Sequence, residues 1–238
     1  MSDRRSTATL LVGFTVLNLA AVVLLGAAYG WPAVLDEPAG VVLPAFAEAQ
    51  TAVVAGFVLQ TLLSVALVPI ALGLHREVDG GARLWPMSVA AFGVLSGLAQ
   101  TLGWIRWPIV VPGLAETWLD PSTTPEVRAA TEVSYDLLNS YAGGALGEYL
   151  GWLFQALWAV GVAVLLVRAG VVTRATAAVG AGLTAVWALS FLVGPAVPAL
   201  AEGLPGTAGF AAYGAWFLWL GFVGLVLLRP ARGLVGAR

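Results

Sequence analysis

The sequence predicts an all-α integral membrane protein, a bundle of six transmembrane helices in a single domain that covers residues 1–238. Hydrophobic residues make up 60% of the chain, charged residues only 10%, and the mean hydropathy is +0.91. Soluble domains contain about a quarter charged residues, so this composition excludes a water-soluble fold. The apolar residues also gather in six runs. Arginines lie before the first run, between the second and third, between the fourth and fifth, and after the sixth.

Each apolar run is long enough to cross a bilayer, whose hydrocarbon core of about 30 Å needs about 20 helical residues. The first run is longer than the apolar part of a secretory signal, so we expect a span there too. We place the spans near residues 8–29, 50–74, 86–105, 144–167, 175–195 and 210–228.

The arginines predict the orientation. Only Arg106 and Arg128 lie on the side of the expected membrane where most carboxylates gather. Because short cytoplasmic loops are enriched in positive charge, we expect both termini in the cytoplasm. The other nine arginines lie on that side: Arg4, Arg5, Arg76, Arg83, Arg168, Arg174, Arg229, Arg232 and Arg238.

The longest connection, between the third and fourth spans, contains an amphipathic helix near residues 124–141. Thr124 is a suitable N-cap, Pro125 suits the first helical position, and apolar residues then recur every three or four positions up to Tyr141. We expect this helix to lie along the outer membrane surface or over the mouth of the bundle. Gly143 and Gly144 would then let the chain turn into the fourth span.

Composition excludes several chemistries. With no cysteine, no lysine and one histidine, the chain lacks a thiol nucleophile, a Schiff-base lysine and a His-rich metal site. A net charge of −2 provides no basic face for nucleic acid. We therefore expect no cofactor, no metal and no nucleic-acid partner. His75 follows the second span and is expected to be a solvated helix cap.

Charged residues at membrane depth point to function or to pairing, and two stand out. Glu148 lies about one turn inside the fourth span, and Arg106 ends the third span at similar depth. Spans three and four return through the same leaflet, so these side chains are expected to form a salt bridge. Gly143, Gly147 and Gly151 form a ridge that lets a neighbouring helix backbone come close.

This pair has two interpretations. In the first, the salt bridge only pins the third span to the fourth. In the second, Arg106 recognises an anionic or carbonyl group and Glu148, the candidate catalytic residue, donates or accepts a proton. This interpretation adds four further binding residues. Asn139 and Tyr141 would lie at the rim of the pocket, and Trp152 and Gln155 share the helical face of Glu148. The side chains of Tyr141 and Trp152 would form walls of the pocket.

A second set of polar residues lies deeper in the spans. Such side chains act either as interhelical hydrogen-bond donors and acceptors or as the lining of a polar cavity. The set comprises Asn18, Gln60, Ser64, Ser96, Gln100, Gln155, Thr184 and Ser190.

Two stretches, residues 102–112 (LGWIRWPIVVP) and 139–151 (NSYAGGALGEYLG), resemble a bacterial family of multi-spanning membrane proteins classed as a domain of unknown function. The resemblance implies an inner-membrane location and a helical bundle, with no known activity. It draws attention to Arg106, Asn139, Tyr141, Gly147 and Glu148.

Three functions remain open from the sequence. The leading hypothesis is binding or transport of a small amphiphilic or hydrophobic molecule that enters from the outer leaflet. The alternatives are an intramembrane enzyme that uses Glu148 for acid–base work on an isoprenoid or lipid, and a subunit or chaperone of a membrane complex. The expected partners are thus the bilayer and a small amphiphile or lipid, with no inference about oligomeric state.

Overall fold

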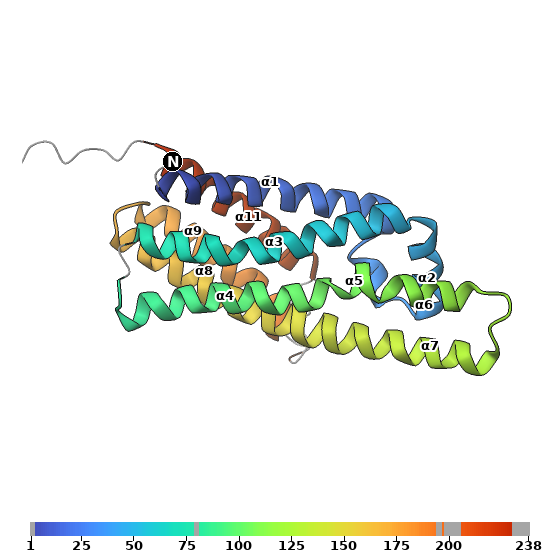
Figure 1. Cartoon of the computed structure of the whole chain (residues 1–238). Helices are drawn as coiled ribbons and strands as arrows, with labels where there is room; N and C mark the ends of the chain where they lie inside the picture. Colours follow the sequence, from blue (N-terminus) through green and yellow to red (C-terminus); the bar gives the residue numbers. More distant parts are fainter. Residues whose placement is uncertain (1–2, 79–80, 194–196, 198–205, 230–238) are drawn as a thin grey trace, which may run out of the picture.

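The computed structural model describes residues 3–78, 81–193, 197 and 206–229, and that part of the chain is helical with no strand. Six helical stretches are long and apolar enough to span a bilayer, which confirms the predicted all-α membrane bundle (Figure 1). They are Asp3–Tyr29, Gln50–Glu77, Leu84–Leu119, Pro125–Arg168, Arg174–Val193 and Gly206–Leu228.

Some of these stretches are single helices and others are chains of shorter ones. The single helices are α1 (Asp3–Tyr29), α3 (Gln50–Glu77) and α11 (Gly206–Leu228). The third stretch joins α4 (Leu84–Trp104), α5 (Arg106–Ile109) and α6 (Val111–Leu119). The fourth joins α7 (Pro125–Leu138), the π-helix η2 (Asn139–Leu150) and α8 (Gly151–Arg168), and the fifth joins α9 (Arg174–Ala188) to the π-helix η3 (Leu189–Val193).

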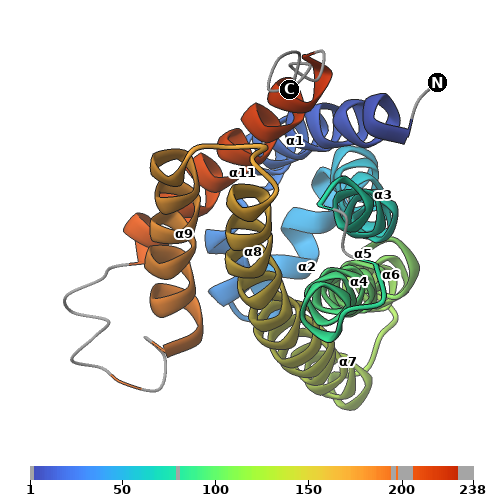
Figure 2. The ribbon, with the colours of Figure 1, turned by 90° about the vertical axis from the view of Figure 1, so that its left-hand side faces the viewer.

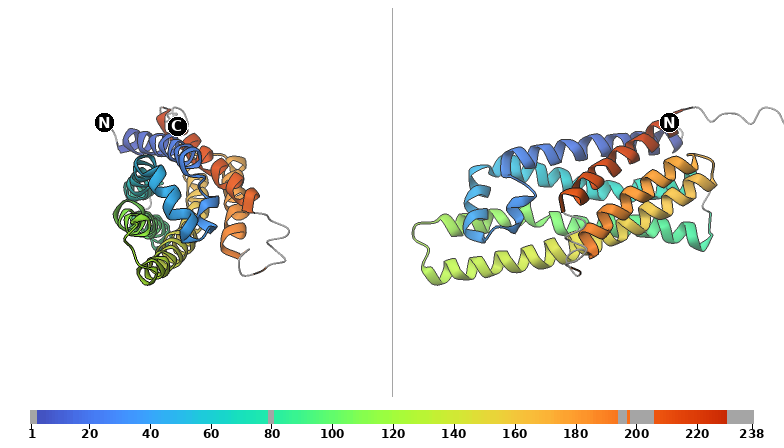
Figure 3. Two further views of the ribbon diagram at one scale, coloured as in Figure 1. Left: turned by 90° about the vertical axis from the view of Figure 1, so that its right-hand side faces the viewer. Right: turned by 180° about the vertical axis from the view of Figure 1, so that it is seen from behind.

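The spans form a closed ring in which each contacts the next, in the order α1, α3, α4, α8, α9, α11 and back to α1 (Figure 2). The chain begins and α11 ends at one end of this ring, here called the N-terminal end (Figure 3). Ion pairs of Arg76 with Asp3 (3.2 Å) and of Arg4 with Glu77 (3.5 Å) join α1 to α3 there.

The opposite end, here called the hairpin end, differs from the prediction. We expected the chain to turn at Gly143 and Gly144, but α7, η2 and α8 run on as one helical stretch of 44 residues (Figure 1). At about 1.5 Å per residue this is roughly 60 Å, twice the thickness of a bilayer core. With α6 it forms a hairpin that projects beyond the ring of spans (Figure 1).

The amphipathic helix itself is present as α7, and its cap is the predicted one. Thr124 accepts a hydrogen bond from the backbone N–H of Val127, and Pro125 is the first helical residue. Its apolar stripe, however, faces outward: Val133 and Leu137 are 66% and 67% exposed. Thr131 and Tyr135 are the buried residues of α7.

A short helix that the sequence analysis missed fills the space beside this hairpin. The segment after α1 forms the 3-10 helix η1 (Ala33–Asp36) and then α2 (Ala39–Glu48), which packs against α6 and α7. Gly30 ends α1 with a φ of +68°, a left-handed conformation that favours glycine. The apolar residues therefore form two cores, one inside the ring and one at the hairpin end around Phe46, Phe57 and Trp107.

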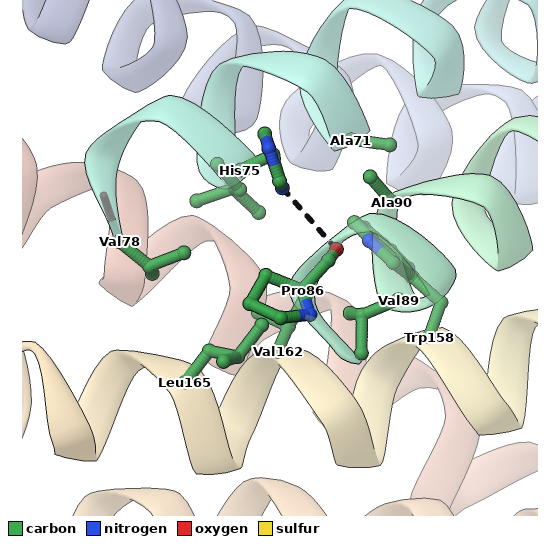
Figure 4. A pocket seen from close by; sticks show the side chains of 10 residues that line it. Ala71, His75, Val78, Pro86, Val89, Ala90, Trp158, Val162 and Leu165 are labelled. Atoms are coloured by element: carbon green, nitrogen blue, oxygen red, sulfur yellow. Dashed lines mark hydrogen bonds between the residues drawn. The ribbon is translucent and has the colours of Figure 1, made fainter. Parts of the chain in front are cut away.

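At the N-terminal end, His75 is more than a solvated cap. Its Nδ1 lies 3.2 Å from the carbonyl oxygen of Pro86 (Figure 4). Its Nε2 lies 3.1 Å from the carbonyl oxygen of Gly81. A neutral ring has one N–H and donates to one of these two carbonyl oxygens at a time; the contact with Pro86 links the end of α3 to the start of α4. The cavity beside it holds about 10 Å³, at most the space of one water molecule.

Candidate functional site

A cavity of about 430 Å³ lies inside the ring, toward the hairpin end. This size lies within the range usual for small-molecule sites. Residues of α1, α3, α4, α8 and α11 line it, together with the Trp31–Pro32 segment: Asn18, Leu19, Val22, Trp31, Pro32, Gln60, Gln100, Trp104, Trp152, Thr207, Phe210, Tyr213, Gly214 and Phe217.

Six of the fourteen residues that line the cavity are aromatic. Trp31 makes edge contacts with both Trp104 and Phe210, with ring centroids 6.3 Å apart in each case. Trp152 lies 6.1 Å from Tyr213. These rings give the cavity a broad apolar surface, and no charged side chain of the described residues lines it.

Five polar residues interrupt this surface: Thr207 lies on the outer side, and the other four differ in how their side chains are bonded. Gln100 and Tyr213 are held from behind by Gln155, whose Oε1 accepts hydrogen bonds from Gln100 Nε2 (3.0 Å) and from the Tyr213 hydroxyl (2.8 Å). Gln100 Nε2 also donates to the Ser96 hydroxyl oxygen at 2.9 Å. Gln155 thus orients two wall residues without lining the cavity itself.

Asn18 and Gln60 are different. Their side chains are only 7% and 6% exposed, and neither makes a hydrogen bond within the described part of the chain. The other buried glutamines, Gln100 and Gln155, are both bonded to protein groups. Two amides therefore face the cavity with their donors and acceptors free.

The residues predicted from charge lie elsewhere, at the junction of the ring and the hairpin. Arg106 is 4% exposed, and its guanidinium donates to the carbonyl of Gly103 and to Asn139 Oδ1 (3.0 Å). Asn139 Nδ2 donates in turn to the carbonyl of Leu35 in η1 (3.2 Å). Arg106 also lies 5.3 Å from the ring of Trp107.

The expected salt bridge between Arg106 and Glu148 is not formed. Glu148 is close enough to interact electrostatically with Arg106, but the two side chains are not within the 4.0 Å of an ion pair. The guanidinium is directed to Asn139 instead, because η2 continues as a helix and places Asn139 beside it. Glu148 does not line the cavity.

The prediction that the glycine ridge lets a neighbouring helix backbone come close is confirmed. A Cβ on Gly103 of α4 would come within 2.6 Å of the Cα of Gly147, so the two helix backbones touch there. One turn away on either side, Gly151 packs against Gln100 and Gly143 against the Arg106 guanidinium. Because η2 packs against α4 through these contacts, it remains helical at Gly143 and Gly144, where we expected a turn.

The six predicted binding residues therefore divide into three groups. Arg106, Asn139 and Glu148 cluster at the junction, whereas Trp152 lines the cavity and Gln155 supports its wall. Tyr141 is 62% exposed and belongs to neither. The sequence analysis had offered a polar cavity as one interpretation of Asn18, Gln60 and Gln100, but it did not connect them with Trp152. No group of three or more metal-ligating side chains occurs among the described residues.

Together the ring of apolar helices and its internal cavity define a multi-pass α-helical membrane protein. Comparison with protein families then places it: the chain belongs to the family described as Domain of unknown function (DUF4386), which matches residues 7–224. No curated protein and no solved structure matches it.

Proposed function

We propose that this protein binds a small, largely apolar molecule in the cavity between α1, α3, α4, α8 and α11. The observation that carries the proposal is the pair of unbonded amides, Asn18 and Gln60, in an aromatic-walled space. Both amides border the cavity, so a ligand bound there can accept hydrogen bonds from their N–H groups and donate to their oxygens.

The location of the cavity supports entry from one leaflet. The cavity lies in the half of the ring toward the hairpin end, where Trp31, Pro32 and Thr207 mark its outer side. With the orientation expected from the arginines, this half faces the outer leaflet. Binding or transport of an amphiphile from that leaflet remains the function that we favour, at a site different from the one expected.

The two alternatives stay predictions. The enzyme hypothesis depends on Glu148, yet among the described residues no carboxylate lines the cavity. The subunit hypothesis would use the exposed apolar residues of α7, and nothing in the structure identifies a partner for them.

A cavity-filling substitution tests the proposal. A Cβ on Gly214 meets no atom within 4 Å, and Gly214 lines the cavity, so Gly214→Leu places a side chain in the ligand's space without a backbone clash. The matched control is Gly182→Leu in α9, where a Cβ also meets nothing within 4 Å and the cavity is not affected.

The measurement is native mass spectrometry of protein extracted gently with its native lipids. We expect the wild type and Gly182→Leu to carry the same bound small molecule. Gly214→Leu should bind it roughly 5- to 150-fold more weakly, since overfilling a packed site costs about 1–3 kcal/mol. A wild type without any bound molecule, or a Gly214→Leu variant that retains it fully, would contradict the proposal.

A further inference from the structure

Asn18 and Gln60 line the deep part of the cavity, and the outer part is lined mainly by aromatic rings, with Thr207 beside them. Asn18 and Gln60 each lie about three helical turns from the hairpin-side end of their helices, Tyr29 and Gln50. Trp31 and Phe210 lie at or near the helix ends and form the outer part of the wall. An elongated ligand can therefore place a polar head at depth and an apolar body among the outer rings.

The deep part of the cavity is uncharged. The buried Arg106 and the half-buried Glu148 belong to the junction and do not line the cavity. A charged head group inside this space would lose its hydration without gaining a counter-ion, which is a large free-energy cost. The lining therefore selects against both anions and cations.

The amides of Asn18 and Gln60 are also not needed to hold the helices together. Buried polar side chains that join helices here are bonded, such as Ser96 to the carbonyl of Gly151 (2.9 Å) and Thr15 to that of Phe217 (3.0 Å). Asn18 and Gln60 make no such bond among the described residues. Each amide offers both N–H donors and an oxygen acceptor to whatever occupies the cavity.

We propose that Asn18 and Gln60 form a head-group subsite for an uncharged hydrogen-bonding group, a hydroxyl, carbonyl or carboxamide, whose apolar chain extends toward Trp31 and Phe210. This inference rests on the proposed function and narrows its ligand to neutral amphiphiles. Asn18 and Gln60 are the residues that determine specificity, and Gln155 positions the wall beside them.

The test compares probes that share one chain and differ in the head: brominated decanol, decanoate and decyltrimethylammonium. Bromine quenches tryptophan fluorescence at short range, and Trp31, Trp104 and Trp152 line the cavity. The full-length protein is reconstituted in lipid nanodiscs, and probes are compared at equal concentration in the bilayer. Specific binding is the saturable quenching that the wild type shows and Gly214→Leu lacks.

We expect the alcohol to bind at least about tenfold more tightly than either charged probe. Asn18→Leu and Gln60→Leu should each weaken alcohol binding by roughly three- to tenfold, the effect of one lost hydrogen bond. Gln50→Leu, a substitution at the exposed start of α3, is the matched control and should leave binding unchanged. Thermal unfolding of the Asn18 and Gln60 variants should occur at the wild-type temperature or above it, which separates lost binding from lost folding.

Three results overturn the subsite: a charged probe that binds as tightly as the alcohol, unchanged alcohol affinity in both leucine variants, or no saturable quenching by the alcohol. Each of these leaves the proposed function intact if Gly214→Leu still displaces the co-purified molecule. Loss of that displacement instead contradicts the proposed function itself, so the two failures are distinguishable.

Discussion

Arg106 and Asn139 are joined by a hydrogen bond of 3.0 Å, and Asn139 passes the connection on to the carbonyl of Leu35 at 3.2 Å. This chain of contacts links α5, the start of η2 and the η1 segment, which lie far apart in the sequence. Because η1 follows Trp31 and Pro32, the same contacts fix the segment that forms the outer wall of the cavity. Arg106 therefore holds α5, η2 and, through Asn139, η1 together at the hairpin end.

This geometry predicts the outcome of a charge exchange. Arg106→Glu should destabilise the protein by about 3–5 kcal/mol, since it places an unpaired charge in a buried site. Adding Glu148→Arg should recover only a small part of that loss, because the donors of Arg106 are directed to Gly103 and Asn139 rather than to Glu148. Thermal unfolding of the single and double variants measures this. Full recovery in the double variant would indicate a direct ion pair instead.

The sequence was sufficient for the spans, and the physical reason is simple. Hydropathy over about 20 residues decides whether a helix can remain in lipid, and it needs no knowledge of neighbouring helices. The glycine ridge was also readable, because spacing by four residues places Gly143, Gly147 and Gly151 on one helical face. Both features depend on local order along the chain.

Features that depend on which helix covers which face were not predictable in this way. Gly143 and Gly144 suggested a turn, but close packing against Gly103 favours continued helix. The apolar stripe of α7 predicted which face of the helix would be apolar. It did not show that α2 would pack on the opposite face. The helix α2 contains Pro44 and follows Pro38, which concealed the apolar positions Val42, Leu43 and Phe46.

The candidate site was partly predictable for the same reason. Trp152 and Gln155 were selected because they share a face with Glu148, and they do belong to the cavity wall and its support. Asn18 and Gln60 lie on different helices, so no spacing within the sequence connects them. Only the closed ring of spans brings them to one cavity.

The contact of Gly103 with Gly147 gives a prediction about packing. Gly103→Ala should destabilise the protein by about 1–3 kcal/mol, since its Cβ would lie 2.6 Å from the Cα of Gly147 and the helices must separate. Gly144→Ala is the control, in the π-helix that carries Gly147, where a Cβ meets only the Asn139 carbonyl oxygen at 3.9 Å. It should be neutral or stabilising by up to about 1 kcal/mol. Equal unfolding temperatures for the two variants would show that the backbones do not touch.

The same substitution at two glutamines should affect stability differently. Gln155→Leu removes the acceptor of both Gln100 and Tyr213, which leaves donors unsatisfied at a cost of about 1–3 kcal/mol. Gln60→Leu removes an amide with no partner among the described residues, so stability should stay the same or increase. Denaturation of both variants in one detergent measures the difference. A Gln60→Leu variant as unstable as Gln155→Leu would mean that Gln60 has a structural partner.

The orientation of the bundle can be tested by labelling, because the chain has no cysteine and any introduced one is unique. Val133 is 66% exposed on α7, and a bilayer core needs only about 20 of the 44 residues in its helical stretch, so we expect the hairpin to extend into water. Arg5 lies at the N-terminal end, which we expect to be cytoplasmic from the distribution of the arginines. A membrane-impermeant maleimide should therefore label Val133→Cys in intact cells and Arg5→Cys only after permeabilisation, with the cysteine-free chain as background. Labelling of Arg5→Cys in intact cells would reverse the orientation and move the cavity to the inner leaflet.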